Sequence, residues 1–182
     1  MECYFLLNKF DSTIITANKI LSFEKIDENT SEKALYLLAK SLLQNSNSGQ
    51  AIEEFKKLTN AKNTEYASEA QYTLAEIQYN NKNLEESEKI ILEITSNPSS
   101  EYWLAKAFIL WADIFKQRGN KIQAKQTLQS IIENYEGDES IIKLAQDKLD
   151  EINNKQTQEQ KLQEQKLQEQ KEAVDEITIE NK

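Results

Sequence analysis

The segment from Tyr102 to Tyr135 constrains the fold of this chain more than any other. In its first half, small and large apolar residues recur at spacings of three and four, the pattern of one face of an α-helix. They are Trp103, Ala107, Phe108, Trp111, Ala112 and Phe115. The second half repeats the pattern with Ile122, Ala124, Leu128, Ile131 and Ile132. A turn at residues 118–120 separates the halves, so the segment predicts a helical hairpin that needs neighbours on both sides.

The same hairpin pattern recurs twice upstream, at nearly constant intervals. The equivalent small residues of the first helices are Ala39, Ala75 and Ala112, separated by 36 and 37 residues. Those of the second helices are Ala51, Ser87 and Ala124, at the same two intervals. Small residues at helix crossings allow two backbones to approach closely. Because the register is kept in both helices, the sequence predicts a stack of helical repeats.

A fourth, weaker copy lies at the start of the chain. Residues 10–21 match the second helix of the hairpin, with Thr13 at the small position, but only MECYFLLN remains for a first helix. A half-repeat would expose an apolar stripe at the end of a stack. We therefore expect Met1 to be an internal start or the edge of a fragment, with further repeats before it.

The predicted repeat domain covers residues 1–153. Its units comprise about residues 1–28, 31–63, 67–99 and 101–137. We expect one helix to begin at residues 30–31 and residues 47–49 to separate it from the next. A capping helix is predicted at 138–153, with Asp138 as its N-cap and one polar face.

Residues 154–182 form a low-complexity tail with the repeat KLQEQ. Five residues advance about 140° around a helix, so the leucines of successive repeats share no stripe. Such a segment cannot bury a core of its own. We expect the tail to be disordered or a solvated helix.

Composition narrows the function classes. The 182 residues include three Gly and one Pro, and so few helix breakers favour an all-α chain. There is no histidine and a single cysteine, which removes the commonest general base and most transition-metal ligand sets. No glycine-rich phosphate loop or nucleophile motif is present. We therefore predict a chain that is not an enzyme and that needs no cofactor.

Charge and hydropathy limit the partners further. The net charge of −9 repels phosphate backbones, so nucleic acid is not an expected ligand. No apolar run approaches the roughly 20 residues of a membrane span, and the N-terminus does not resemble a signal peptide. No direct membrane insertion is expected.

The paired helices, the 36–38-residue intervals and the small positions resemble tetratricopeptide repeats. The likeness rests mainly on Phe108, Trp111-Ala112, Phe115, Gly119 and Ala124, which match the family pattern of aromatic, large-small pair, aromatic and small residue. The upstream units depart from it: Leu35, Leu42, Gln71 and Gln78 stand in aromatic positions. The resemblance implies an α-solenoid of antiparallel helix pairs, wound as a right-handed superhelix. The chain also resembles the C-terminal repeats of long bacterial tetratricopeptide proteins.

Members of this family are non-catalytic scaffolds that hold a peptide or helix in a concave groove lined by their first helices. By matching positions, the resemblance implies that ten residues line this groove. They are Lys33, Tyr36, Lys40, Glu69, Tyr72, Glu76, Tyr79, Lys106, Asp113 and Lys116. Tyrosines suit a binding groove because they combine apolar area with a hydrogen-bonding tip.

Two interpretations stay open from the sequence. The first is a protein-interaction scaffold that binds a partner peptide or helix in the groove. The second is a structural or self-assembly segment of a larger cell-envelope protein. A periplasmic or envelope location follows if the chain is the C-terminal part of a longer exported protein, and a cytoplasmic one if Met1 is the true start. The sequence leaves the oligomeric state open.

Overall fold

The computed structural model describes residues 1–180 of the chain, and their side chains except at 159, 161–164 and 167–180. All regular secondary structure within this range is helical, which confirms the all-α prediction. The helices are α1 (Glu2–Leu6), α2 (Phe10–Leu21), α3 (Glu28–Gln44), α4 (Ser48–Leu58), α5 (Thr64–Asn80), α6 (Leu84–Ser96), α7 (Glu101–Gln117), α8 (Lys121–Asn134) and α9 (Glu139–Glu180).

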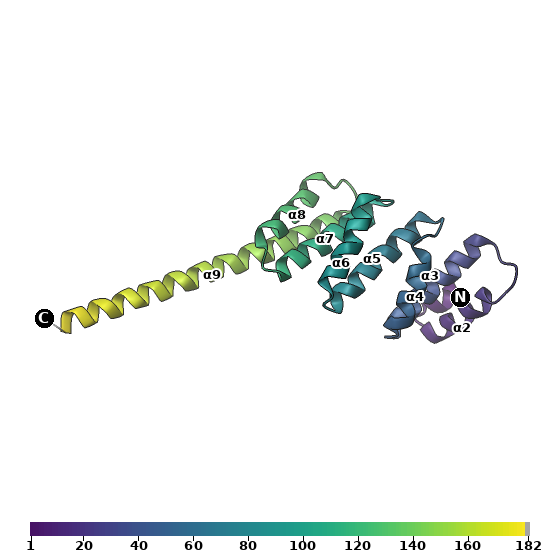
Figure 1. The fold of residues 1–182 in the computed structure, drawn as a ribbon, viewed down its shortest axis with the longest axis horizontal. Helices are drawn as coiled ribbons and strands as arrows, with labels where there is room; N and C mark the ends of the chain where they lie inside the picture. The colour runs from purple at the N-terminus through teal and green to yellow at the C-terminus, as the bar shows by residue number, and fades with distance from the viewer. Residues whose placement is uncertain (181–182) are drawn as a thin grey trace.

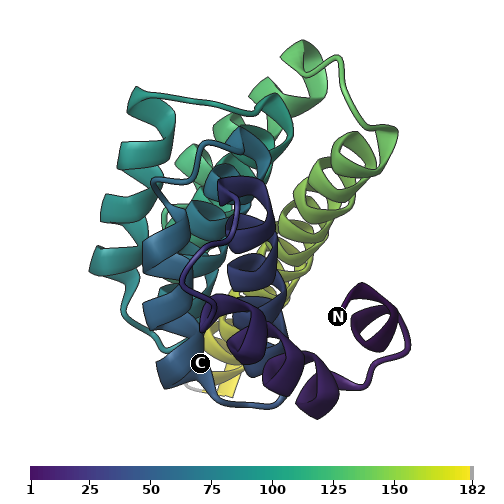
Figure 2. The same cartoon turned by 90° about the vertical axis from the view of Figure 1, so that its right-hand side faces the viewer.

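The helices stack as a solenoid of antiparallel pairs (Figure 1). The pairs α3–α4, α5–α6 and α7–α8 each pack closely, and α4 and α6 also contact the first helix of the next pair. We call α3, α5, α7 and α9 the A helices and α4, α6 and α8 the B helices. Seen along the stack, α1 lies to one side of the other helices (Figure 2), where it contacts α2 and α3. The handedness of the superhelix stays a prediction.

Apolar residues of each pair form a core that continues into the next pair. One cluster joins α2 to α5 around Phe55 and Leu58, which are both almost completely buried. A second joins α5, α6 and α7 around Ile91 and Ile114, and a third joins α7, α8 and α9 around Leu128. The residues at the predicted small positions are all buried: Ala39, Ala51, Ala75, Ser87, Ala112 and Ala124. Continuous burial from pair to pair is what stabilises a repeat stack.

The turn inside each helix pair has the same backbone geometry. Asn8, Ser46, Lys82 and Gly119 have positive φ angles of 56°, 60°, 65° and 78°. The residue after each donates its backbone N–H to a carbonyl in the last turn of the preceding helix, as in a Schellman motif. This recurring turn sets the A and B helices of each pair antiparallel.

Several helix boundaries differ from the predicted ones. Helix α3 begins at Glu28, ahead of the predicted start at residues 30–31, because the Asp27 side chain accepts a hydrogen bond from the Thr30 N–H at 2.9 Å. Residues 48 and 49 belong to α4, and the chain reverses one residue earlier than residues 47–49, at Ser46. Asp138 does cap α9, since its carboxylate accepts a hydrogen bond from the Ser140 N–H at 2.8 Å.

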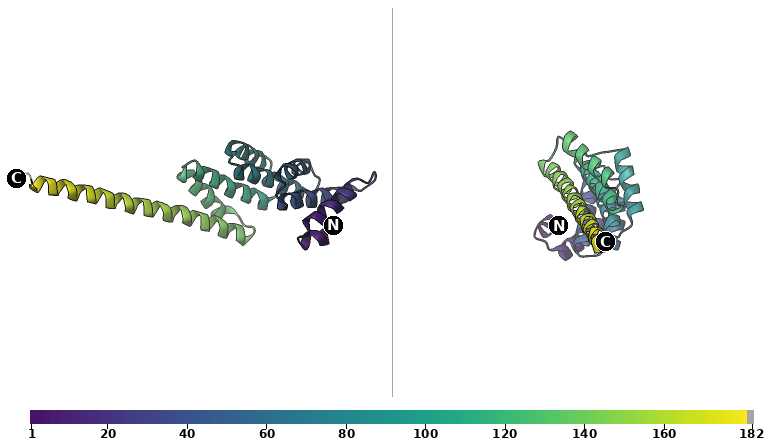
Figure 3. Two further views of the ribbon diagram at one scale, coloured as in Figure 1. Left: turned by 90° about the horizontal axis from the view of Figure 1, so that it is seen from below. Right: turned by 90° about the vertical axis from the view of Figure 1, so that its left-hand side faces the viewer.

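Helix α9 continues without a break from Glu139 to Glu180. Its first part packs against α7 and α8, and its remainder projects beyond the stack (Figure 3). The structure therefore has no change of secondary structure at residue 154, where the tail is predicted to begin. Residues 181 and 182, at the end of that tail, lie outside the described residues. The division into units, cap and tail stays a prediction.

Candidate protein-binding surface

The ten predicted groove residues all lie on A helices. Together they define what we call the A-helix face, the side of the stack formed by α3, α5, α7 and α9. Nine of the ten are half-buried, and Tyr72 is buried. Adjacent A helices contact each other directly from α5 onward, so this face is continuous there.

Three of the ten residues form a hydrogen-bonded cluster between α3 and α5. The Tyr36 hydroxyl donates to Glu69 Oε2 at 2.7 Å, and Lys40 Nζ donates to Glu69 Oε1 at 2.8 Å. Lys40 Nζ also donates to the Tyr36 hydroxyl at 2.9 Å. Burial, followed by the hydrogen bond to Glu69, raises the pKa of Tyr36 well above its ordinary value. Tyr66 stacks on the ring of Tyr36 with their centroids 4.4 Å apart. The cluster holds these side chains in one arrangement, which favours a preformed surface.

A second group lies between α5 and α7 around a pocket of about 160 Å³. Tyr72 donates its hydroxyl hydrogen to Glu76 at 2.8 Å, and burial, followed by the charge of Glu76, raises the pKa of Tyr72. Lys106 Nζ lies 4.5 Å from the ring centroid of Tyr72 and 5.0 Å from that of Trp103. Such a cation over aromatic faces is held electrostatically. Within the described residues, no carboxylate lies within ion-pair distance of Lys106.

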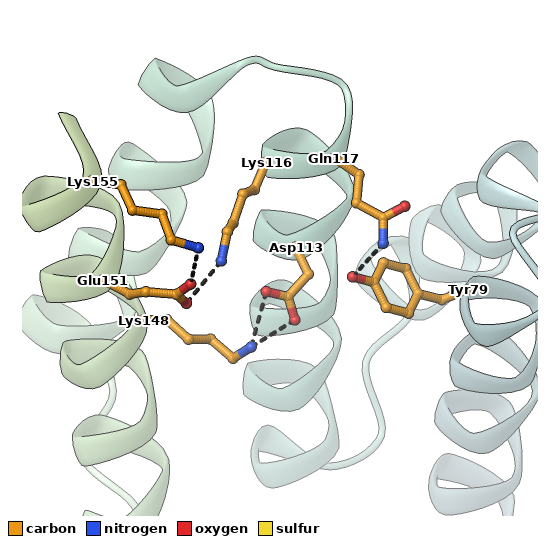
Figure 4. Close-up of polar contacts among 7 residues, drawn as sticks. All are labelled: Tyr79, Asp113, Lys116, Gln117, Lys148, Glu151 and Lys155. Carbon is orange, nitrogen blue, oxygen red and sulfur yellow. Dashed lines mark hydrogen bonds and ion pairs between the residues drawn. The ribbon is translucent and has the colours of Figure 1, made fainter. Parts of the chain in front are cut away.

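The groove residues nearest the C-terminus already have partners on α9 (Figure 4). Lys148 Nζ donates to both oxygens of Asp113 at 2.9 and 2.8 Å. Lys116 pairs with Glu151 at 2.8 Å, and Lys155 donates to the same carboxylate at 2.7 Å. The hydrogen bonds from Lys116 and Lys155 lower the pKa of Glu151 to about 2. Helix α9 therefore extends the A-helix face and satisfies these two positions.

Two predicted residues lie apart from these groups. Tyr79 accepts a hydrogen bond from the Gln117 side chain at 2.7 Å, between α5 and α7. Lys33 forms an ion pair with Glu2 at the N-terminal end of the stack. The structure thus brings Lys40, Glu69, Tyr72, Glu76 and Lys106 together around one pocket and places the other five along the face on either side.

Several residues of this face were not predicted from the sequence. Trp103, interpreted as core, also lines the pocket and donates its indole N–H to Glu65 at 2.5 Å. Lys148 and Glu151 lie 35 residues after Asp113 and Lys116, which is close to the repeat interval. Applying the interval once more to Asp113 and Lys116 would have indicated these two positions of the capping helix as members of the same face, although not their ion pairs with α7.

Neither a metal-binding cluster nor a membrane-spanning helix is present in the described part of the chain. No cluster of three or more His, Cys, Asp and Glu in that range is placed to hold a metal ion. No helix there is long and apolar enough to cross a membrane.

The fold defines an α-helical repeat protein, an α-solenoid of antiparallel helix pairs. Residues 101–137, which contain α7 and α8, match the family model of the tetratricopeptide repeat. This match supports the predicted tetratricopeptide family, whose repeats typically bind protein partners and are typically non-catalytic. No curated protein and no solved structure compared with the chain gives a match. The likeness to the C-terminal repeats of long bacterial proteins stays a prediction.

Proposed function

We propose that this chain is a non-catalytic scaffold that binds a peptide or helix of a partner protein on its A-helix face. The observation that carries the proposal is the pocket between α3, α5 and α7. Its wall contains Lys106, a cation on an aromatic cradle that lacks a carboxylate partner in the described part of the chain. The Lys106 ammonium group can bind a carboxylate or carbonyl oxygen of a partner with little rearrangement.

The neighbouring clusters support the same proposal. Glu69 and Tyr36 fix each other, so the pocket wall is held in place before a partner binds. Preorganised surfaces lose less conformational entropy on binding. The residues of the A-helix face are aromatic and mixed polar, as is common at protein-binding surfaces, where tyrosine and tryptophan supply contact area.

The test compares two variants that reverse the same charge. Lys106→Glu places a carboxylate at the pocket, whereas Lys56→Glu changes an exposed lysine of α4 on the B-helix side. In quantitative pull-downs from the native source, partner recovery should fall at least tenfold with Lys106→Glu and stay within twofold with Lys56→Glu. Equal recovery with both variants would remove the pocket from the binding surface. Circular dichroism checks that both variants keep their helicity. Tyr72 is less suitable as a target because it is buried in the α5–α7 core.

A second candidate is the structural or self-assembly role. The N-terminal end of the stack favours it, because Leu6, Leu7 and Ile15 are exposed there by 79%, 65% and 68%. Association between copies would bury exposed apolar side chains of this kind. Light scattering of the chain with and without residues 154–182 tests this role, and a monomer in both cases would argue against self-assembly.

A further inference from the structure

A hollow of the described surface lies outside the A-helix face. It has a volume of about 620 Å³ and runs between α7 and α8. Leu104, Ala105 and Phe108 form its floor, and Thr127, Ser130 and Ile131 form its wall. We call it the outer groove. Its volume is within the range of roughly 300–1,000 Å³ that is common for ligand pockets.

The apolar floor of the outer groove continues toward α6. Phe108 stacks on Trp111 with their ring centroids 6.1 Å apart, and the Trp111 indole N–H donates to Glu88 of α6 at 2.9 Å. Glu88 also lines a second hollow, on α6, together with Leu92, whose exposed fraction is 46%. Trp111 thus contacts one residue of each hollow, Phe108 and Glu88. Helix α7 lies between α6 and α8 (Figure 1).

The aromatic residues of this floor have no aromatic counterpart in the preceding helix pair. At the equivalent positions of α5, Gln71 and Gln78 stand where α7 has Phe108 and Phe115. The corresponding surface one repeat earlier therefore lacks the aromatic stripe, although it follows the same helix geometry.

The charged residues at the edges of the two hollows are mostly acidic. Four carboxylates there have no ion-pair partner among the described residues: Glu85, Glu93, Glu101 and Glu136. Lys89 is paired with Glu86, and Arg118 with Glu88. An apolar floor between acidic edges attracts a partner with an apolar stripe flanked by positive charges. At this groove the acidic edges repel an anionic lipid surface and a second copy of this acidic chain.

We propose that the outer groove binds a basic amphipathic helix of a partner protein. The groove lies between two helices, and its α8 wall uses Thr127, Ser130, Ile131 and Asn134, at spacings of three and four. These span about 10 Å, or two helical turns, at about 1.5 Å per residue. A helix that presents large apolar residues at i, i+4 and i+7 matches this length, as in helix-in-groove recognition.

The probe is a synthetic helical peptide of about 14 residues with leucine at i, i+4 and i+7 and lysine at most other positions. Fluorescence anisotropy at physiological salt measures its affinity for the full chain. A matched peptide with glutamate in place of lysine should bind at least tenfold more weakly. Equal binding of both peptides, or no binding of the basic one, would overturn the inference.

Two variants of the protein locate the peptide. Ser130→Arg fills the outer groove from an exposed position of α8, and Gln129→Arg adds the same charge to the same helix outside the groove. We expect Ser130→Arg to weaken binding at least tenfold and Gln129→Arg less than twofold. Equal effects would assign the binding to general charge and overturn the inference. Dissociation of a dimer by Ser130→Arg in light scattering would overturn it in favour of a second copy.

A third variant separates this inference from the proposed function. Lys106→Glu should leave the affinity for the basic peptide within twofold, because Lys106 lies on the A-helix face. Loss of binding with Lys106→Glu, but not with Ser130→Arg, would place the peptide on that face and overturn only the outer groove. If Lys106→Glu leaves partner recovery in the pull-down unchanged, only the proposed function is contradicted.

Discussion

The turn residues Ser46 and Lys82 adopt a backbone conformation that glycine accepts more easily. Their φ angles of 60° and 65° lie in the left-handed region, where a Cβ atom costs about 1–2 kcal/mol. Only the last pair has glycine at this position, Gly119 with φ of 78°. Gly119 therefore allowed the turn at residues 118–120 to be predicted. Ser46 and Lys82 did not indicate their positive φ angles, because serine and lysine rarely adopt them.

Replacing Ser46 by glycine should stabilise the fold. The relief of the left-handed strain exceeds the greater entropy of glycine in the unfolded chain, so we expect a gain of ~0.5–1 kcal/mol. Urea denaturation measures the change. Ser48→Gly, at the first residue of α4, is the matched control and should cost up to ~0.5 kcal/mol, because glycine lowers helix propensity. A loss with Ser46→Gly as large as with Ser48→Gly would contradict this interpretation of the turn.

At the scale of the element, α9 does more than cover the end of the stack. The sequence predicted its start, its N-cap and its apolar stripe, because these follow from local capping and periodicity. The ion pairs of Lys148 and Glu151 with α7 were not predicted, since they depend on how α9 lies against α7 in space. These contacts therefore cover part of the polar face of α9, which was predicted to face solvent.

The Glu151 ion pairs make the docking of α9 depend on pH. The pKa of Glu151 is lowered from 4.5 to about 2, so its contribution is complete above about pH 4.5 and is lost as the pH falls toward 2. A carbon-13 NMR titration of the Glu151 carboxyl should give a midpoint near 2. Lys116→Gln should move the midpoint up toward the ordinary value, and Lys143→Gln, an exposed position of α9, should not. A wild-type midpoint near 4.5 would show that the pairs do not form in solution.

At the scale of the whole molecule, most of the fold could be predicted from the repeat interval. The all-α solenoid follows from the pattern of small residues, which the structure shows to be buried. The assignment of the ten groove residues stays a prediction, although the structure groups five of them around one pocket. The outer groove could not be predicted, because Phe108 and Ile131 have the same pattern in the sequence as fully buried core residues.

The central claim is that the A-helix face, at Lys106, is where a partner binds. A photo-crosslinking residue placed at position 106, and in a separate variant at position 56 of α4, tests it directly in the native source. We expect a crosslinked partner from position 106, with at most a tenth of that yield from position 56. A crosslinked partner from position 56, with none from position 106, would contradict the claim.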